Sequence, residues 1–438
     1  MNQKAEIVPV ESLGPAQFKS PLRLSTVEGD GVGNFVSEDS YVRHRVEGRA
    51  DLADVDDPLF EKAGPREKLF FNPADTRVAM VTCGGLCPGL NNVIRSAFLE
   101  LHYGYGVTDV LGFRYGYRGL NPAHNLAPVR LTPELVERID KHGGTILGTS
   151  RGQEPLDVMA DTLERERINV LLCVGGDGTQ RGAHQLHQEL ARRGMKVAVV
   201  GIPKTIDNDI HYCSVTFGYG TAIDAARDVL QFAHNEARSA LNGIALVKVM
   251  GRDAGFIAAG ATLASQEVNF TLIPEVPLKL GGAGGFLGAL KDRILARGHA
   301  VIVVAEGAGQ ELFEDRHGER DASGNIRYHD IGYHLKGAIN EYFTGQGIPI
   351  DLKYIDPSYI LRSVPANCFD SLLSDQLARR AVHAAMAGRT DVIIAYWNRA
   401  FMHVPIAMAT ETRKLVDPEG ELWTSVLATT GQPRCYTG

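Results

Sequence analysis

The chain has 438 residues, 44% of them hydrophobic and 22% charged, which is an ordinary globular composition with room for two domains. Its formal net charge of -7 argues against nucleic acid or an anionic membrane surface as the main partner. The apolar runs are shorter than a membrane span and the polar start lacks the apolar core of a signal peptide, so we expect a cytoplasmic protein without a membrane partner. The six cysteines include no pair of CxxC motifs, which predicts neither a disulfide framework nor a cysteine zinc site.

Residues 1–75 have no sustained alternation of strand and helix patterns. Their acidic clusters and scattered apolar side chains are typical of an arm that lies on another surface. A partner subunit is one candidate for that surface, which would make the arm an oligomer contact. A partly disordered segment before the first domain is an equally good interpretation.

A regular strand, turn and helix pattern begins at Arg77. An apolar run at 77–83 is followed by a glycine turn at Gly84, a helix pattern from Leu90 and a second strand that ends at Phe113. A glycine turn between a strand and a helix lets backbone amides face a phosphate.

A further helix pattern starts at Thr132, which is followed by a proline, as is common at the first helical position. The loop after this helix pattern, residues 147–154, places Arg151 among small residues. Its guanidinium could reach a phosphate there, although a lone arginine on a loop is more often only solvated.

Two short Val- and Ile-rich runs at 168–174 and 196–202 flank a helix pattern at 179–194, which is the βαβ arrangement of a parallel sheet. Ligands bind beyond the carboxyl ends of such strands. The VGGDGT turn after the first run offers backbone amides to an anion, and Asp177 could share a Mg²⁺ ion with it. Alone, this short motif fits a plain turn with Asp177 as the helix cap equally well.

The turn after the second run, GIPKTIDND, places one cation and two carboxylates within six positions. This set of groups suits phosphoryl transfer to a hydroxyl group: Asp207 would take the proton, Asp209 would orient it, and Lys204 would offset the transferred charge. The alternative is an Asx-type turn whose charges are only solvated.

The pattern restarts after Asp209, which predicts a second α/β unit. Its expected helices cover 221–240 and 286–297, and its expected strands cover 243–249, 269–275 and 300–310. A DASGN stretch near Gly324 predicts a surface hairpin or insertion.

Polar side chains follow these strands at positions suited to a sugar or a phosphate. Met250, Gly251 and Arg252 follow one strand and Glu306 lies in another, so a guanidinium, a close backbone and a carboxylate could meet one ligand. Further along, residues 353–364 carry Lys353, Tyr359 and Arg362, whose two cations could clamp a second phosphate.

We therefore predict an α/β fold of two facing, doubly wound, Rossmann-like domains with an N-terminal arm. The expected divisions are the arm at 1–75, a nucleotide-binding domain at 76–212, a substrate domain at 213–370, and helices and a strand at 371–438 that complete both domains.

Several motifs occur in the order found in 6-phosphofructokinases, and the chain resembles that family from about Arg77 to its end. They are GGLCPGLNNVIR, YGYRGL, LGTSRG, GGDGTQ, PKTIDND, MGRDAGFIA, VAEG and YIDPSYILR. The likeness is closest to the long-chain branch that uses ATP. It implies transfer of the γ-phosphoryl group of ATP to the 1-hydroxyl of fructose 6-phosphate in glycolysis, with Mg²⁺, allosteric control and a homotetramer or dimer.

The resemblance also assigns roles to residues. Nucleotide contacts are implied for Gly84, Arg151, Gly152, Gly176, Asp177, Gly178 and Thr179, with Asp177 on Mg²⁺. Substrate contacts are implied for Thr205, Ile206, Asp207, Met250, Gly251, Arg252, Glu306, Tyr359 and Arg362. Catalytic roles are implied for Asp207 as the base and Arg252 as a stabiliser of the transferred charge, and are expected for Lys204, Thr205 and Asp209 beside them.

Two positions bear on the phosphoryl donor and point in different directions. In this family a glycine at position 178 leaves room for the α-phosphate of ATP, whereas pyrophosphate users usually carry an aspartate there. Lys204 stands where short bacterial ATP enzymes have glycine and pyrophosphate enzymes have lysine. A lysine can bind phosphate without excluding a nucleotide, so Gly178 has more weight and ATP is the expected donor, with pyrophosphate as the alternative.

The chain departs from the family pattern in the sugar-phosphate site that partner subunits share. Asn242 and Gly243 lie where short bacterial members place an arginine, and Lys353 replaces another. Arg95 lies near a position that contacts effectors in some members, but a charge on a helix surface is an equally good interpretation.

Two other classes of protein remain as alternatives. GGDGT also resembles the nucleotide turn of NAD and lipid kinases, which would not need the TIDND, MGR and YILR stretches together. A sugar-phosphate sensor without catalysis would not need both Asp177 and Asp207.

Overall fold

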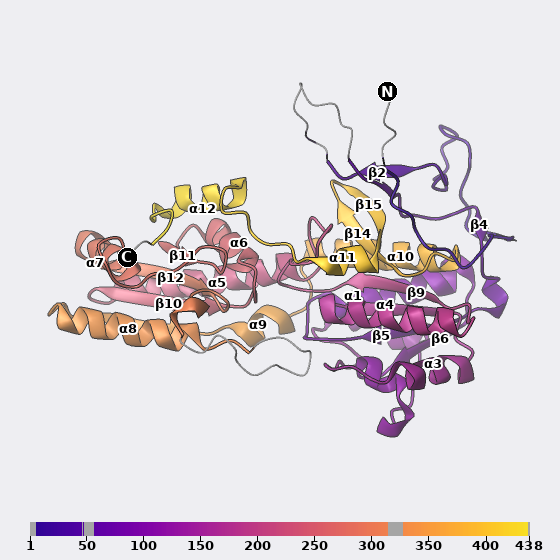
Figure 1. Ribbon diagram of the computed structural model, residues 1–438, viewed down its shortest axis with the longest axis horizontal. Helices are drawn as coiled ribbons and strands as arrows, with labels where there is room; N and C mark the ends of the chain where they lie inside the picture. The colour runs from indigo at the N-terminus through magenta and orange to yellow at the C-terminus, as the bar shows by residue number, and fades with distance from the viewer. Residues whose placement is uncertain (1–5, 46, 48–56, 314–326, 437–438) are drawn as a thin grey trace. The chain divides into compact units, whose positions relative to one another are not determined.

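The structure is a computed structural model and describes residues 6–45, 47, 57–313 and 327–436. The chain forms two compact units (Figure 1). Unit 1 consists of Met1–Thr205, Ile210–Gly218 and Pro365–Arg413, and unit 2 consists of Ile206–Asp209, Tyr219–Val364 and Lys414–Gly438. The hairpin predicted near Gly324 lies outside the described residues.

Within the described residues, unit 1 contains a mixed sheet of seven strands. The strands are β5 (Arg77–Thr82), β6 (Asp109–Phe113), β7 (Val129–Arg130), β8 (Val170–Gly175), β9 (Ala198–Pro203), β14 (Val392–Trp397) and β15 (Ala400–Pro405). Their order is β15-β14-β9-β8-β5-β6-β7; the five inner strands are parallel and the two edge strands antiparallel. Every residue of β8 and β9 is buried, which is why both appear in the sequence as continuous apolar runs.

Helices surround this sheet. They are α1 (Leu90–Leu99), α2 (Pro133–Val136), α3 (Leu156–Arg165), α4 (Asp177–Arg192), α10 (Cys368–Met386) and α11 (Ile406–Glu411). The hydroxyl of Thr132 caps α2, accepting a hydrogen bond from the amide of Leu135 at 3.2 Å. The helix expected after Thr132 is nevertheless short, because the amide of Glu137 bonds three residues back, to Glu134, and α2 ends there.

Unit 2 contains, in its described part, a sheet of four parallel strands in the order β11-β12-β10-β13. The strands are β10 (Gly243–Val249), β11 (Phe270–Leu272), β12 (His299–Ala305) and β13 (Asp351–Ile355). The helices are α5 (Tyr219–Ser239), α6 (Phe256–Ser265), α7 (Phe286–Arg297), α8 (Ile331–Gly345), α9 (Ser358–Ser363) and α12 (Glu421–Thr430). The prediction of α7 at 286–297 is correct at both ends.

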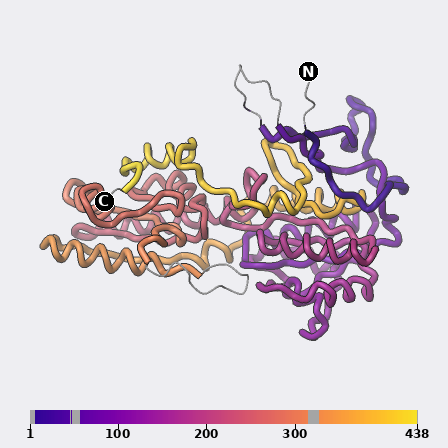
Figure 2. The backbone as a smooth tube through the Cα atoms, in the orientation of Figure 1, coloured from indigo at the N-terminus to yellow at the C-terminus, as the bar shows by residue number. Residues whose placement is uncertain are grey.

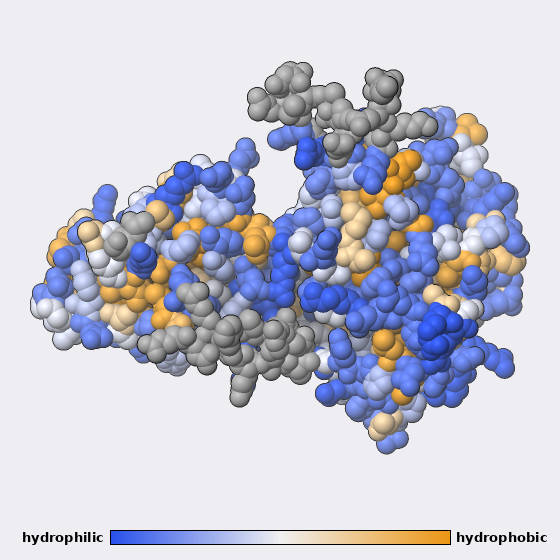
Figure 3. Space-filling model, in the orientation of Figure 1, coloured by the Kyte–Doolittle hydropathy of each residue, from blue (hydrophilic) through white to orange (hydrophobic). Residues whose placement is uncertain are grey.

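The predicted fold class is confirmed: the protein is α/β, and parallel pairing dominates both sheets. Polar residues cover much of the face of each unit in Figure 3. Along the described residues, no helix has the length and apolar content needed to cross a membrane. All six cysteines are free thiols, as the spacing in the sequence predicts.

The described part of residues 6–75, here called the N-terminal arm, packs on unit 1. It contains β1 (Phe18–Lys19), β2 (Tyr41–Arg43), β3 (Leu59–Glu61) and β4 (Lys68–Leu69). The strands pair as β1 with β4 and β2 with β3, both antiparallel. The arm lies beside the edge strand β15 (Figures 1 and 2), where Lys62 bridges to Met402 and the amide of Ala63 bonds the carbonyl of Phe401 at 2.8 Å. Phe60 is fully buried in the core of unit 1.

Glu61 is the centre of the arm's attachment. Its Oε1 accepts hydrogen bonds from Arg66 at 2.7 Å and Arg389 at 2.9 Å, and lies 3.1 Å from Nδ1 of His403. Arg66 is 1% exposed, and its guanidinium also donates to three backbone carbonyls of the arm. Burial opposes ionisation of Glu61, but the hydrogen bonds and charges of His403 and Arg389 outweigh it, so the pKa of Glu61 is lowered.

We expect Glu61→Gln to lower the free energy of unfolding of unit 1 by about 3 kcal/mol, because it leaves the buried guanidinium of Arg66 with only the exposed carboxylate of Glu38, 3.7 Å from its Nε. Glu38→Gln is the matched control: Glu38 also pairs with Arg389, but its side chain is 64% exposed, so the loss should stay below about 1 kcal/mol. Urea unfolding at pH 7 measures both variants, and equal losses would contradict the role given to Glu61.

The lowered pKa of Glu61 also sets the sign of the pH dependence. A carboxylate whose pKa is lower in the folded state stabilises the fold above its unfolded pKa of about 4.3, and this contribution is lost as the pH falls. The difference in the free energy of unfolding between the wild type and Glu61→Gln should therefore become smaller below about pH 4.

Candidate active site

One candidate binding turn lies in unit 1, where β8 turns into α4. Gly176 is the N-cap of α4, and Asp177 is its first residue. Two buried side chains hold this turn. The amide of Gln180 donates to the carbonyl oxygen of Gly175 at 2.9 Å, and the hydroxyl of Tyr117 donates to that of Thr179 at 2.8 Å. The first amides of a helix have no partner within the helix, so this end of α4 can bind an anion.

The surroundings of two glycines in this turn differ in how much space they leave for a side chain. A Cβ on Gly175 would lie 2.4 Å from Cβ of Thr179, so the fold itself requires this glycine. A Cβ on Gly178 would have no heavy atom within 4 Å. Glycine in a helix costs up to about 1 kcal/mol relative to alanine, so Gly178 keeps a space open at the expense of stability.

We expect opposite effects on stability from alanine at these two positions. Gly175→Ala should lower the free energy of unfolding by about 1–3 kcal/mol, since the contact with Thr179 forces the backbone to move. Gly178→Ala should be neutral or stabilise by up to about 1 kcal/mol. Denaturant unfolding without ligands measures both. A comparable loss in Gly178→Ala would mean that the fold, and not a ligand, requires Gly178.

A second glycine turn follows β5 and contacts the loop that carries Arg151. The amide of Gly84 donates to the carbonyl oxygen of Ser150 at 2.9 Å, and the hydroxyl of Thr149 donates to the carbonyl oxygen of Gly84 at 2.7 Å. These bonds bring Gly84 close to Arg151 and Gly152. They also engage the amide of Gly84, which donates to the protein itself in this structure, and the nucleotide contact of Gly84 stays a prediction. Because Gly84 has no side chain, other groups can approach its backbone closely.

Lys204 joins the two turns. It is 5% exposed, follows β9, and its Nζ donates to the carbonyl oxygen of Gly85 at 2.6 Å. A Cβ on Gly84 would lie 3.1 Å from the same Nζ. The neighbouring thiol of Cys83 is buried, and burial raises its pKa to about 12, so it is not a nucleophile. The next residue, Thr205, accepts a hydrogen bond at its carbonyl oxygen from the hydroxyl of Thr216 at 2.7 Å.

Asp177 is the candidate magnesium ligand. Its carboxylate accepts a hydrogen bond from Arg181, and its Oδ2 lies 3.8 Å from Nη2 of Arg413. Mg²⁺ usually takes one or two carboxylates and fills its remaining positions with phosphate and water oxygens. No group of three metal-ligating side chains in the described part of the chain includes Asp177. The residue therefore fits an ion shared with bound phosphate, and not one caged by protein alone.

A separate group of candidate residues lies in unit 2, at the ends of β10 and β12. Arg252 has a left-handed backbone (φ 50°), and its amide donates to Oε1 of Glu306 at 3.1 Å. A Cβ on Gly307 would lie 1.8 Å from the carbonyl oxygen of Arg252, so glycine is needed for this close approach. Gly251 is also left-handed, with φ 141°. The structure thus brings together Met250, Gly251, Arg252 and Glu306, as the sequence predicts.

Residues Ile206–Asp209 belong to unit 2, so the predicted GIPKTIDND turn passes from one unit to the other after Thr205. Lys414 holds this segment: its Nζ lies 3.0 Å from Oδ1 of Asn208, and its amide donates to the carbonyl oxygen of Asp209 at 2.9 Å. Ile206, Asn208 and Asp209 are buried and Asp207 is partly buried.

Glu275 supports the segment that carries Lys414. It accepts hydrogen bonds from the amides of Val416 at 2.8 Å and Gly255 at 2.9 Å. Burial raises the pKa of its carboxyl group, although these amide bonds oppose the shift. The sequence analysis missed Gln180, Glu275 and Lys414. Only Gln180 had a signal, because it ends the GGDGTQ motif; the other two lie far along the chain from the residues they hold.

Tyr359 and Arg362 lie on α9, where the guanidinium of Arg362 is 5.3 Å from the centre of the Tyr359 ring. Asp356 lies two residues before α9 and accepts a hydrogen bond from the amide of Ser358, the first residue of that helix, at 3.1 Å. Lys248 of β10 fixes Asp356, with its Nζ 3.0 Å from Oδ2. The two predicted cations of this stretch are on different elements, because Arg362 is on α9 whereas Lys353 is on β13, with its Nζ 3.0 Å from Oδ1 of Asp351.

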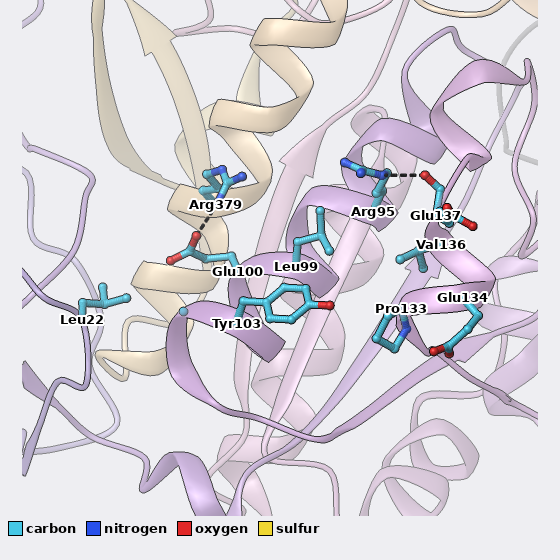
Figure 4. Close-up of a pocket in the computed structure, with 11 residues that line it drawn as sticks. Leu22, Arg95, Leu99, Glu100, Tyr103, Pro133, Glu134, Val136, Glu137 and Arg379 are labelled. Carbon is cyan, nitrogen blue, oxygen red and sulfur yellow. Dashed lines mark hydrogen bonds and ion pairs between the residues drawn. The ribbon is translucent and has the colours of Figure 1, made fainter.

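A pocket of about 890 Å³ lies elsewhere in unit 1 and includes Arg95 of α1 (Figure 4). The Nε of Arg95 donates to the carbonyl oxygen of Glu137 at 3.3 Å, and Arg379 pairs with Glu100. The charged residues lining the pocket are Arg95, Arg379, Glu100, Glu134 and Glu137. Because carboxylates outnumber cations here, this lining does not favour an anion, and an effector contact at Arg95 stays a prediction.

Comparison with known proteins assigns the family. The family model for phosphofructokinase matches residues 77–385, which is more than half of the chain. The chain belongs to the phosphofructokinase family. The resemblance seen in the sequence is thereby confirmed, and the glycine turns and the Arg252 loop described above lie within the matched region.

Named relatives of the phosphofructokinase family cover almost the whole chain. The chain is 48% identical over 432 residues to the ATP-dependent 6-phosphofructokinase of Borreliella burgdorferi, covering 97% of this chain and 96% of that protein. It is 46% identical to the ATP-dependent 6-phosphofructokinase of Amycolatopsis methanolica, covering 97% and 94%. A crystal structure of a pyrophosphate-dependent phosphofructokinase from Marinobacter aquaeolei superposes with a TM-score of 0.65 at 18% identity, covering 83% of this chain and 92% of that one. At that identity the likeness concerns the fold alone.

Proposed function

We propose that this chain is an ATP-dependent 6-phosphofructokinase, which transfers the γ-phosphoryl group of ATP to the 1-hydroxyl of fructose 6-phosphate and yields fructose 1,6-bisphosphate and ADP in glycolysis. The observation that carries the proposal is the open space at Gly178, beside Asp177 on the first turn of α4. An anion bound at this helix end has room for a further phosphate there. The two relatives described above, both named ATP-dependent, support the same donor.

In this proposal the residues of unit 1 bind the nucleotide. The first turn of α4, from Gly176 to Thr179, contacts the phosphates chiefly through the amides of Asp177 and Gly178, because the amide of Thr179 donates to the carbonyl oxygen of Gly176 at 2.9 Å. Arg151 and Gly152 border the phosphates from the neighbouring loop. Gly84 lets the chain approach closely. When bound at Asp177, Mg²⁺ would neutralise charge on the phosphate oxygens. Lys204 holds the glycine turn in place through its bond to Gly85.

The residues of unit 2 bind the sugar phosphate and move the proton. Asp207 accepts the proton of the 1-hydroxyl as the phosphoryl group transfers, and Asp209 orients the reacting groups together with Thr205, the residue of unit 1 that precedes this segment. Arg252 donates to the phosphoryl oxygens, where negative charge gathers. The proposed sugar-phosphate contacts are Ile206, Met250, Gly251, Glu306, Tyr359 and Arg362. The bond from Arg252 to Glu306 fixes the loop for this purpose.

An initial-rate assay of fructose 1,6-bisphosphate formation with Mg²⁺ tests the function. We expect turnover with ATP and none with pyrophosphate. Turnover with pyrophosphate alone would assign donor choice to Lys204 and overturn the proposed donor. No turnover with either donor would favour the NAD or lipid kinase class or a sensor, and would overturn the proposed activity.

Gly178→Asp should separate donor choice from folding. The variant should fold, because nothing in the protein lies within 4 Å of the added Cβ, but its carboxylate would occupy the open space and repel a phosphate there. We expect turnover with ATP to fall at least ~100-fold, because placing two like charges in contact costs several kcal/mol. Gly178→Ala is the control for size without charge and should retain much more activity. Full activity in Gly178→Asp would remove the basis of the donor assignment.

Asp207→Ser tests the base. We expect fructose 6-phosphate to bind nearly as in the wild type, whereas kcat should fall at least ~100-fold, the usual scale for loss of a general base. Steady-state kinetics combined with equilibrium binding of fructose 6-phosphate separate the two effects. A variant that turns over near the wild-type rate would rule out this role.

We also propose a cytoplasmic homotetramer or dimer with allosteric control, and no nucleic acid partner. The net charge of -7 supports the absence of a nucleic acid partner. Light scattering of the purified protein measures the oligomeric state, and deletion of the arm tests whether it contributes to the contact.

A further inference from the structure

A cluster of metal-binding side chains lies in unit 1 beside the second half of α4. It consists of Glu11 from the N-terminal arm, His187 from α4 and Asp391 from the residue before β14. One ligand atom of each lies within 4.8 Å of the other two. The Nε2 of His187 is 3.1 Å from Oε1 of Glu11. Two ligands of one tetrahedral Zn²⁺ ion are about 3.3 Å apart, given metal–ligand distances near 2.0–2.1 Å.

Backbone hydrogen bonds fix the positions of both carboxylates. The carbonyl oxygen of Glu11 accepts from the amide of Thr390 at 3.1 Å, which attaches the arm next to Asp391. The amide of Asp391 donates to the carbonyl oxygen of Val199 at 2.8 Å, and its backbone is left-handed at φ 54°. Such a conformation outside glycine costs free energy and is found where the surroundings hold the residue in place. The carboxylates are therefore placed together by the fold and do not meet by chance of side-chain rotation.

The side chains next to the cluster orient its members as outer partners orient metal ligands. His187 is 5% exposed, and its Nδ1 lies 3.2 Å from the hydroxyl of Thr390, which leaves Nε2 directed at Glu11. Nδ1 of His184, one helical turn before His187, lies 2.9 and 2.8 Å from the two carboxylate oxygens of Asp391. Hydrogen bonds from hydroxyl and imidazole groups to the ligands are typical of the surroundings of protein metal sites.

The charges of the cluster favour a cation. Among the residues that the structure describes, no lysine or arginine forms an ion pair with Glu11 or Asp391. Two carboxylates at this separation repel each other, and a bound cation relieves the repulsion.

We propose that Glu11, His187 and Asp391 bind one Zn²⁺ ion or a similar divalent transition-metal ion. One imidazole nitrogen and two carboxylate oxygens suit such ions, whereas Mg²⁺ and Ca²⁺ prefer oxygen ligands alone. Water completes the coordination. The ion attaches the N-terminal arm to α4, whose first residue is Asp177, and so it is separate from the magnesium ion proposed for the phosphates.

Metal binding to the full-length, chelator-treated protein tests the proposal. Zn²⁺ is titrated in competition with a chromophoric chelator, so that the readout does not depend on enzyme activity. We expect the wild type to bind one Zn²⁺ that Glu11→Gln and Asp391→Asn bind at least ~100-fold more weakly, since loss of even an outer partner of a metal site costs 10–100-fold. Asparagine tolerates the left-handed backbone of Asp391 and can keep the contact with His184.

Glu6→Gln is the matched control, because Glu6 is another exposed glutamate of the arm and lies outside the cluster. Glu6→Gln should bind Zn²⁺ with the affinity of the wild type. Addition of Zn²⁺ should raise the Tm of Glu6→Gln but leave the Tm of Glu11→Gln unchanged. The two exposed cysteines are present in both variants, so any binding to them cancels in the comparison. Equal Zn²⁺ affinity of Glu11→Gln and Glu6→Gln, or a wild type that binds no Zn²⁺, would overturn the proposal and leave the cluster as a network of hydrogen bonds and ion pairs.

Discussion

The side-chain amide of Gln180 holds together the carboxyl ends of two parallel strands. It is fully buried and donates to the carbonyl oxygens of Cys173 and Gly175 in β8 and approaches that of Ile202 in β9. The parallel register pairs Gly175 with Pro203, so the turn after each strand emerges at the same edge. Gly201 is part of this arrangement, because a Cβ there would lie 2.0 Å from Oε1 of Gln180. The turn from Gly176 to Thr179 and Lys204 are neighbours as a result.

The parts of the fold and site that could be predicted are those in which local sequence and local structure agree. Continuous apolar runs such as β8 and β9 are buried on both faces, so their pattern identifies them without further information. The glycines of the phosphate turns are visible because they break such runs. In unit 2, Met250 and Arg252 were predicted as a group since each follows directly from the end of β10.

Other features depend on contacts between residues that are distant along the chain. Nothing near Glu275 indicates that its carboxylate joins Gly255 to Val416, and nothing near Lys414 indicates that it holds Asn208. The sequence also does not determine which surface the N-terminal arm packs on, because its apolar side chains are compatible with any hydrophobic surface. The amide of Gly84 is a further case: its motif suggests a phosphate ligand, whereas a loop more than sixty residues later provides its partner. A sequence pattern indicates that a segment needs a hydrogen-bond partner or a packing surface, but it does not indicate which distant segment provides that partner or surface.

The hydrogen bond between Lys204 and Gly85 bears on how a lysine in this position can select a ligand. A buried ammonium group that already donates to a carbonyl oxygen at 2.6 Å does not gain a full new interaction when a phosphate arrives. It exchanges one acceptor for another, and only the difference between the two contributes to affinity. The glycine turn would also lose a support in that exchange. A lysine restrained in this way discriminates weakly between donors, whereas an unoccupied space at a helix end discriminates by admitting or refusing a group outright.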